Sequence, residues 1–82
     1  RALAECSNYA LALLRLIAKQ GGTSGSVPAI EETFCERWGE GGLYYMPSAR
    51  TLTRLGLAYA VEGNSRSYYL LPEGVIAALE KF

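Results

Sequence analysis

Apolar residues in the first quarter of the chain recur every three or four positions, which is the period of an amphipathic helix. We expect a helix over residues 2–20, because Ala and Leu are abundant there and both favour helix. Lys19 falls in its last turn, where a cation stabilises the helix dipole, and Gly21-Gly22 ends it. The expected core positions are Leu3, Cys6, Ala10, Leu13 or Leu14, and Ile17.

A second helix is expected from Pro28, because proline is tolerated in a first turn and glutamates follow near the positive end of the dipole. Ile30, Phe34 and Trp38 lie at steps of four and form one stripe that we expect to be buried. Residues 39–42 (GEGG) end this helix. Acidic side chains repeat on another face, which we interpret as a solvated surface: Glu32, Glu36 and Glu40.

The segment before Gly56 predicts a third helix. Residues 43–46 (LYYM) are compatible with a short strand or with the first turn of this helix, and Pro47 opposes a helix that continues undisturbed through it. The pattern predicts a helix over residues 48–55, with Ser48 as its N-cap and Gly56 ending it in the left-handed conformation. Its inner face is expected to hold Ala49, Leu52 and Leu55.

Residues 57–62 and 66–71 are typical of strands, and the turn pair Gly63-Asn64 between them predicts a β-hairpin. We expect Tyr69 to be a half-exposed cross-strand residue. A two-residue turn groups the side chains of one hairpin face, which we expect to cover the core: Leu57, Tyr59, Val61, Tyr68 and Leu70. A last helix follows Pro72-Glu73-Gly74, with helical spacing of Val75, Ile76, Leu79 and Phe82.

Composition narrows the classes of function. The 82 residues suffice for one small domain (1–82), and the first residue, Arg1, indicates a fragment or processed form of a longer chain. No apolar run is long enough to cross a bilayer. The chain has no His, which excludes imidazole-based metal sites and catalysis, and Cys6 and Cys35 are expected to be small core residues in a reducing compartment. The acids lack a second cluster for acid–base work, so we expect no enzyme, cofactor or metal.

Three helices, a hairpin and a closing helix are the element order of a winged helix-turn-helix domain, a mainly helical α+β fold. Residues 52–79 resemble the MarR-like and PadR-like DNA-binding regulators. The resemblance is carried by Leu52, Leu55, Gly56 and Leu57, the hairpin tip 63–66, the strand 68–71 and Pro72-Glu73-Gly74. Leu71 stands where the family has Thr or Ser, and the turn before the third helix is longer than the family's.

The resemblance implies a sequence-specific duplex-DNA-binding domain of a transcriptional regulator. We expect it to act as a homodimer, because one copy offers few phosphate contacts, and to be cytoplasmic or nucleoid-associated. The recognition helix enters the major groove, and the hairpin, the wing, contacts the DNA backbone or the minor groove. Arg bonds guanine or phosphates, and Ser, Thr and Asn supply short hydrogen bonds. The candidate contacts are Ser48, Arg50, Thr51 and Arg54 on the helix, and Asn64, Ser65, Arg66 and Ser67 on the wing.

The distribution of charge leaves an alternative open. Residues 43–71 carry three arginines against one glutamate, whereas residues 31–42 carry one arginine against four glutamates. Two or three phosphate contacts per copy give weak DNA binding by a monomer. The alternative is a winged-helix protein-interaction module in a multisubunit assembly, without DNA binding. Tyr44 and Tyr45 are candidate contacts for DNA or such a partner, and the first and last helices are a candidate homodimer interface.

Overall fold

The computed structural model describes residues 3–20, 27–39, 43–62 and 67–82. In these ranges the chain forms the 3₁₀ turn η1 (Leu3–Glu5), helices α1 (Asn8–Gln20), α2 (Val27–Trp38) and α3 (Tyr45–Arg54), strands β1 (Tyr59–Glu62) and β2 (Ser67–Leu70), and helix α4 (Val75–Lys81). The fold is α+β and mostly helical, with one antiparallel hairpin, which confirms the predicted class and element order. The predicted turn pair at 63–64 and the glycines at 21–22 and 41–42 lie outside the described residues.

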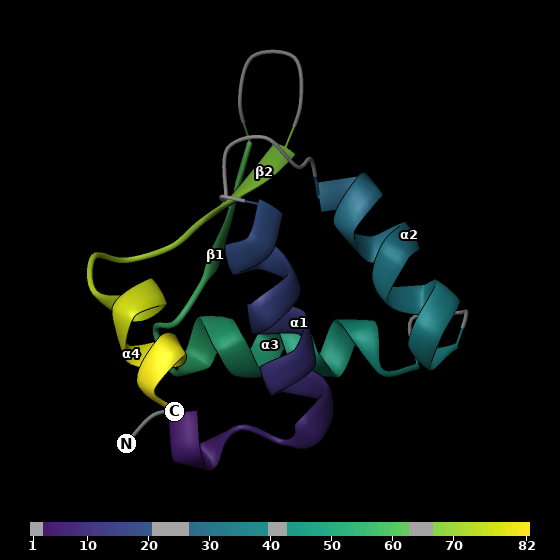
Figure 1. The fold of residues 1–82 in the computed structure, drawn as a ribbon. Helices are drawn as coiled ribbons and strands as arrows, with labels where there is room; N and C mark the ends of the chain where they lie inside the picture. Colours follow the sequence, from purple (N-terminus) through teal and green to yellow (C-terminus); the bar gives the residue numbers. More distant parts are fainter. Residues whose placement is uncertain (1–2, 21–26, 40–42, 63–66) are drawn as a thin grey trace.

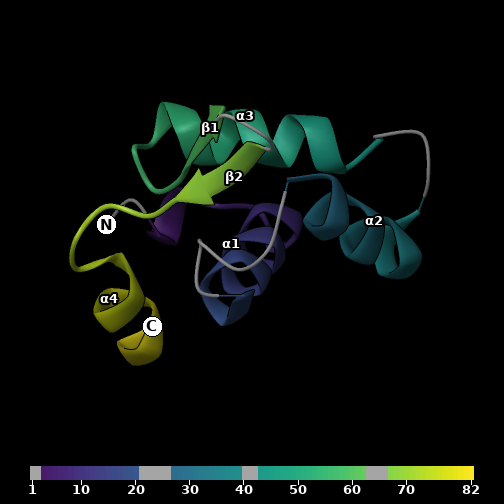
Figure 2. The same cartoon turned by 90° about the horizontal axis from the view of Figure 1, so that it is seen from above.

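Helix α1 lies in front of α3, with α2 on one side and α4 on the other (Figure 1). Figure 2 shows α3 and the hairpin along one side of the molecule, with α1 and α4 toward the opposite side. Helix α1 packs mainly against α3. The largest fully buried side chains come from all three long helices: Leu13, Leu14, Ile17, Ile30 and Leu52. None of the helices in these ranges is long and apolar enough to span a membrane.

Helix α1 begins at Asn8, later than predicted. The Ser7 Oγ accepts a hydrogen bond from the Ala10 backbone N–H (3.1 Å), and the Ser7 carbonyl accepts one from Leu11 (2.9 Å), which is the geometry of an N-cap. A serine that bonds the backbone in this way competes with helix continuation, so η1 and α1 are separate although the apolar spacing runs through both. The expected core positions are buried, except that Cys6 is half-buried.

Helix α3 begins at Tyr45, earlier than the predicted residue 48, so the alternative that placed residues 43–46 in its first turn is correct for Tyr45 and Met46. Pro47 lies in its first turn, where a backbone N–H has no partner inside the helix, so the missing donor costs little. The Ser48 N–H already donates to the Tyr44 carbonyl (3.1 Å) as an intrahelical bond. Ser48 is therefore inside the helix and is not its N-cap, which corrects the prediction.

Helix α3 ends at the predicted glycine. Gly56 has a φ of +74°, in the left-handed region. Its N–H donates to the Thr53 carbonyl (3.0 Å), and the Leu57 N–H donates to the Leu52 carbonyl (2.8 Å). These two bonds form a Schellman motif, which leads the chain from α3 into β1 within a few residues.

The side chains that the paired strands turn toward the core are not those predicted. Tyr59 pairs with Leu70, and Val61 with Tyr68, so these four side chains share a face as expected. That face points outward, because Tyr59 is 40% exposed and Leu70 is 50% exposed. The buried side chain of β2 is Tyr69, which was expected to be half-exposed.

Two observations bear on this orientation. Leu57, which belongs to the predicted inward face, is buried as expected, and so is its neighbour Ala58, just before β1. The hydroxyl of Tyr69 hydrogen-bonds to the hydroxyl of Tyr45 at the start of α3, in the buried interior. The register also pairs Glu62 with Ser67, so the strands are joined by four residues, where a two-residue turn was predicted.

Helix α4 begins without a side-chain cap. Its N-cap is Gly74, with a φ of +89° and no side-chain hydrogen bond to the helix. Val75 and Leu79 are buried, whereas Ile76 and Phe82 are 44% and 56% exposed. Half of the predicted apolar face of α4 is therefore open to solvent.

Candidate nucleic-acid interface

Helix α3 has one buried face and one exposed face. Tyr45, Ser48 and Leu52 are buried at spacings of three and four. At about 100° per residue, Arg50 lies on the opposite side of the helix from this stripe. Arg50 and Arg54 are both exposed, one turn apart. The helix therefore presents two guanidinium groups on the side that the core does not cover.

The exposed face of α3 is basic and shallowly hollowed. Met46, Ala49, Arg50, Thr53 and Arg54 line the hollow. The ten residues of α3 include no acid. Side chains four apart on a helix lie about 5–6 Å from each other at Cβ, so the two arginines can bind the same anionic ligand or adjacent anionic groups. Guanidinium groups suit phosphates and the acceptor edge of guanine.

The other predicted DNA contacts on α3, Ser48 and Thr51, are less exposed to solvent than the two arginines. Ser48 is 3% exposed, so in this structure its hydroxyl is not open to a ligand, as the predicted contact would require. Thr51 is half-buried. Thr53 was not selected from the sequence, yet it is exposed, and its hydroxyl donates to the Ala58 carbonyl (3.4 Å). Thr51 and Thr53 lie on either side of the predicted apolar stripe of α3, so the sequence alone does not show which of them is exposed. Because Ser48 is buried, the inner face of the helix is turned toward Thr51, and Thr53 is open to solvent.

The two tyrosines expected at the surface belong to internal packing. Tyr45 is 3% exposed and hydrogen-bonded to Tyr69, so its side chain is not open to DNA or a partner, as the predicted contact would require. Burial raises the pKa of both hydroxyls, which keeps them neutral. The Tyr44 ring is half-buried and stacks on Tyr9 of α1, with centroids 4.2 Å apart. In the same segment, residues 43–46, the open side chains are Leu43 and Met46, at 67% and 47% exposure.

The structure describes part of the predicted wing. Ser67 is half-buried at the start of β2. Asn64, Ser65 and Arg66 lie outside the described residues. The hairpin lies beside α3 on the same side of the molecule (Figure 2).

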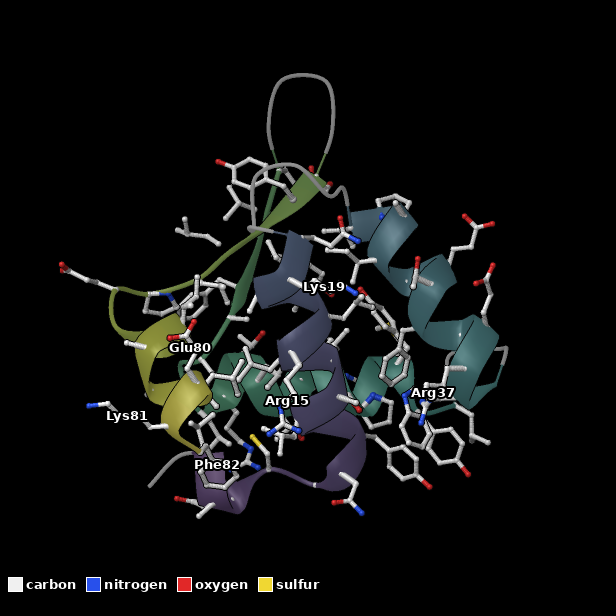
Figure 3. The ribbon with its side chains drawn as sticks, in the orientation of Figure 1. Arg15, Lys19, Arg37, Glu80, Lys81 and Phe82 are labelled. Carbon is white, nitrogen blue, oxygen red and sulfur yellow. The ribbon has the colours of Figure 1, made fainter. Side chains whose placement is uncertain are left out.

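The other cations of the described helices lie elsewhere, with Lys81 in the last turn of α4. Arg15 and Lys19 of α1 and Arg37 of α2 occur on the side of the molecule that faces the viewer in Figure 3, in front of α3. Helix α2 also carries the exposed acids Glu32 and Glu36. The basic surface of α3 is therefore separate from a second basic surface on α1 and α2.

Comparison of the chain with protein-family models, curated proteins and solved structures gave no match. Its function has to be inferred from the chemistry and geometry of these surfaces.

Proposed function

We propose that the chain is a winged helix-turn-helix domain that binds duplex DNA as a homodimer within a transcriptional regulator. Helix α3 enters the major groove, and the hairpin acts as the wing. The observation that carries the proposal is the exposed face of α3, where Arg50 and Arg54 stand one turn apart in a helix without acids. An α-helix fits the major groove, and arginine reads guanine there or bridges phosphates.

The arrangement around α3 supports the same function. Helix α2 precedes α3 and packs against it, and the Schellman motif at Gly56 connects α3 to the hairpin. The hydrogen bond between the hydroxyls of Tyr45 and Tyr69 links the start of α3 to β2. These contacts fix the helix and the hairpin relative to each other, which a two-point contact with DNA requires.

The number of cations sets the expected affinity. Each phosphate neutralised contributes about −0.9 to the slope of log K against log salt, so Arg50 and Arg54 supply a slope of about −2 per copy. Such a monomer binds weakly, and two copies on half-sites about 34 Å apart double the slope. Helix α4, with exposed Ile76 and Phe82, lies away from α3 (Figure 2), so a dimer contact there leaves α3 free.

The test is a fluorescence-anisotropy titration of a labelled mixed-sequence duplex of about three DNA turns, between about 50 and 200 mM salt. We expect binding by the wild type at low salt. The double variant Arg50→Gln/Arg54→Gln should bind at least about tenfold more weakly and lose about two units of salt slope per copy.

The matched control is Arg15→Gln/Lys19→Gln, which removes two cations one turn apart on α1, away from α3. This variant should keep nearly the wild-type salt slope. Absence of binding by the folded wild type at low salt contradicts the proposal. An equal loss in both double variants also contradicts it, because it would indicate unspecific charge attraction.

A second candidate function, protein assembly without DNA binding, is favoured by the outward face of the hairpin. Tyr59 and Leu70 are opposite each other and both are open to solvent, with Val61 and Tyr68 next to them. An apolar sheet face of this kind is typical of an interaction surface. It can pack against a sheet or helix of another subunit.

The double variant Tyr59→Ser/Leu70→Ser separates the two functions. Assembly predicts that a stoichiometric partner no longer co-purifies while the melting temperature stays within a few degrees of the wild type. DNA binding through α3 predicts an unchanged affinity for the duplex in the same variant.

A further inference from the structure

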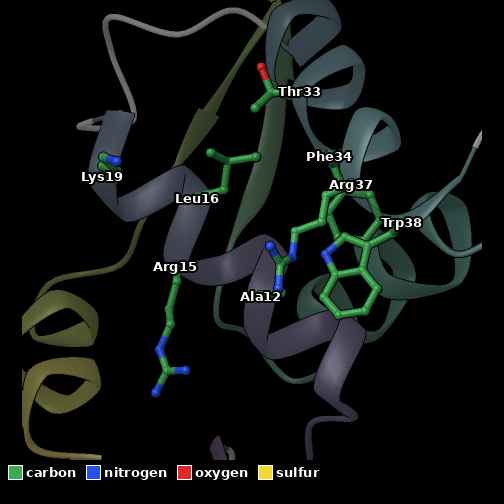
Figure 4. A pocket seen from close by; sticks show the side chains of 8 residues that line it. All are labelled: Ala12, Arg15, Leu16, Lys19, Thr33, Phe34, Arg37 and Trp38. Atoms are coloured by element: carbon green, nitrogen blue, oxygen red, sulfur yellow. The ribbon is translucent and has the colours of Figure 1, made fainter.

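A groove of about 300 Å³ lies between α1 and α2 (Figure 4), on the side of the molecule that faces the viewer in Figure 3, in front of α3. Its floor is apolar and consists of Ala12 and Leu16 from α1 and Phe34 and Trp38 from α2. Its rim carries three cations, Arg15, Lys19 and Arg37. None of these residues belongs to the surface proposed to bind DNA.

The charges of the groove all have one sign. Every ionisable side chain that lines it is Arg or Lys. Arg15 and Lys19 are exposed one turn apart along α1. On the other side of the groove, the Arg37 guanidinium lies 5.2 Å from the centre of the Trp38 ring, a cation–π contact. An apolar floor between positive rims favours an occupant that is apolar on one face and negative at its edges.

The shape of the groove indicates a helical occupant. Leu16 follows Ala12 after one turn of α1, and Trp38 follows Phe34 after one turn of α2, so two apolar stripes run along neighbouring helices. From Ala12 to Lys19 the groove extends over about 10 Å, at 1.5 Å per residue, which is about two turns of a helix. A groove between helices accepts an amphipathic helix through apolar side chains at i, i+3 or i+4, and i+7.

We propose that this groove binds an acidic amphipathic helical segment of another protein. Its apolar side chains contact the floor, and its Glu or Asp side chains pair with Arg15 and Lys19 on one rim and with Arg37 on the other. The proposal does not depend on DNA binding. Because the groove and the exposed face of α3 are on different sides of the molecule, both can be occupied at once.

Trp38 supplies a direct measurement, because it is the only tryptophan of the chain and lies in the groove. The probe is a blocked helical peptide of about fourteen residues without Trp or Tyr, with Leu anchors at helical spacing and Glu at the flanking positions. We expect saturable change of the Trp38 emission with micromolar affinity at low salt. A matched peptide with Gln in place of every Glu should bind about three- to tenfold more weakly.

Two double variants locate the binding site. Arg15→Gln/Lys19→Gln should weaken binding of the Glu peptide by about three- to tenfold and leave that of the Gln peptide nearly unchanged. Arg50→Gln/Arg54→Gln, the matched pair on α3, should change neither. An unaltered Trp38 signal with the Glu peptide, or equal affinities for the two peptides, overturns the proposal. Equal losses in both variants overturn it as well. So does sedimentation in which Arg15→Gln/Lys19→Gln abolishes a self-association that the wild type and Arg50→Gln/Arg54→Gln show, because a second copy of this chain then occupies the groove.

Discussion

The buried hydroxyl pair Tyr45–Tyr69 offers the most quantitative test of how α3 is held against the hairpin. The two side chains are 3% and 4% exposed, and each hydroxyl is the other's hydrogen-bond partner. Replacing Tyr69 by Phe keeps the ring but leaves the Tyr45 hydroxyl buried and unpaired. The expected loss is the desolvation penalty of that hydroxyl, about 1–3 kcal/mol in the free energy of unfolding.

The double variant Tyr45→Phe/Tyr69→Phe should lose less free energy of unfolding than the sum of the losses in the two single variants. It removes both polar groups and retains their rings, so its free energy of unfolding should lie within about 1 kcal/mol of the wild type. A loss of about 2 kcal/mol in Tyr69→Phe corresponds to a fall in melting temperature of roughly 8–16 °C for a domain of this size. The coupling energy of the double-mutant cycle should therefore be about 2 kcal/mol or more.

The assay is equilibrium urea denaturation followed by circular dichroism, with the slope m checked for constancy among the variants. Tyr68→Phe is the matched control, because Tyr68 precedes Tyr69 in the same strand but lies on the outward face. Its free energy of unfolding should change by no more than about 0.5 kcal/mol. Losses below about 0.5 kcal/mol in Tyr45→Phe and Tyr69→Phe, or simple additivity in the double variant, would refute the reasoning.

Further predictions concern pH, the ends of two helices and a thiol. Burial holds the pKa of Tyr45 and Tyr69 above their ordinary value of 10, so the unfolded chain loses these protons first. Urea denaturation should therefore show constant stability at neutral pH and a decline above pH 10, shallower in the double Phe variant. Ser7→Ala should cost about 1 kcal/mol in the same assay through loss of the cap, and Ser7→Asn should retain most of it. Gly56→Ala should cost about 1–2 kcal/mol, because φ is +74° there and the added Cβ is 3.2 Å from the Tyr59 hydroxyl. Burial and Glu5 raise the pKa of the Cys6 thiol, so at neutral pH it should react with a disulfide reagent more slowly than in the urea-unfolded chain.

The sequence was sufficient for features that depend on local spacing. The order of the helices and the hairpin, the stripe of Ile30 and Phe34, and the end of α3 at Gly56 all follow from periodicity and from the conformational freedom of glycine. The exposure of Arg50 and Arg54 also follows from helical geometry, because both are far from Leu52 around the helix.

Long-range packing decided the features that were predicted wrongly. Strand alternation shows which hairpin residues share a face but not which face is inward, and the contact of Tyr69 with Tyr45 makes that choice. Of the two alternatives for residues 43–46, the first turn of α3 is correct, and the helix begins before Ser48 because a first turn needs no N–H at Pro47. With the helix predicted to begin at Ser48, both Ser48 and Tyr45 were predicted to be open to a ligand, although both are buried.

Partial burial also explains why Trp38 was assigned wholly to the core. It continues the stripe of Phe34, and it contacts Tyr9 edge-on with centroids 4.9 Å apart, yet one side of it borders the groove beneath Arg37. Helical spacing alone does not distinguish a side chain at the end of a core stripe from one at the floor of a groove.

The central claim is that the exposed face of α3 contacts duplex DNA, and the most direct measurement is an amide NMR titration with the labelled domain. On addition of a duplex at low salt, the account predicts that the largest shifts occur at Arg50, Thr53 and Arg54. The amides of Arg15 and Lys19 should stay nearly unchanged. Shifts confined to the α1–α2 groove, or no shifts in a folded sample at equimolar DNA, would contradict the claim.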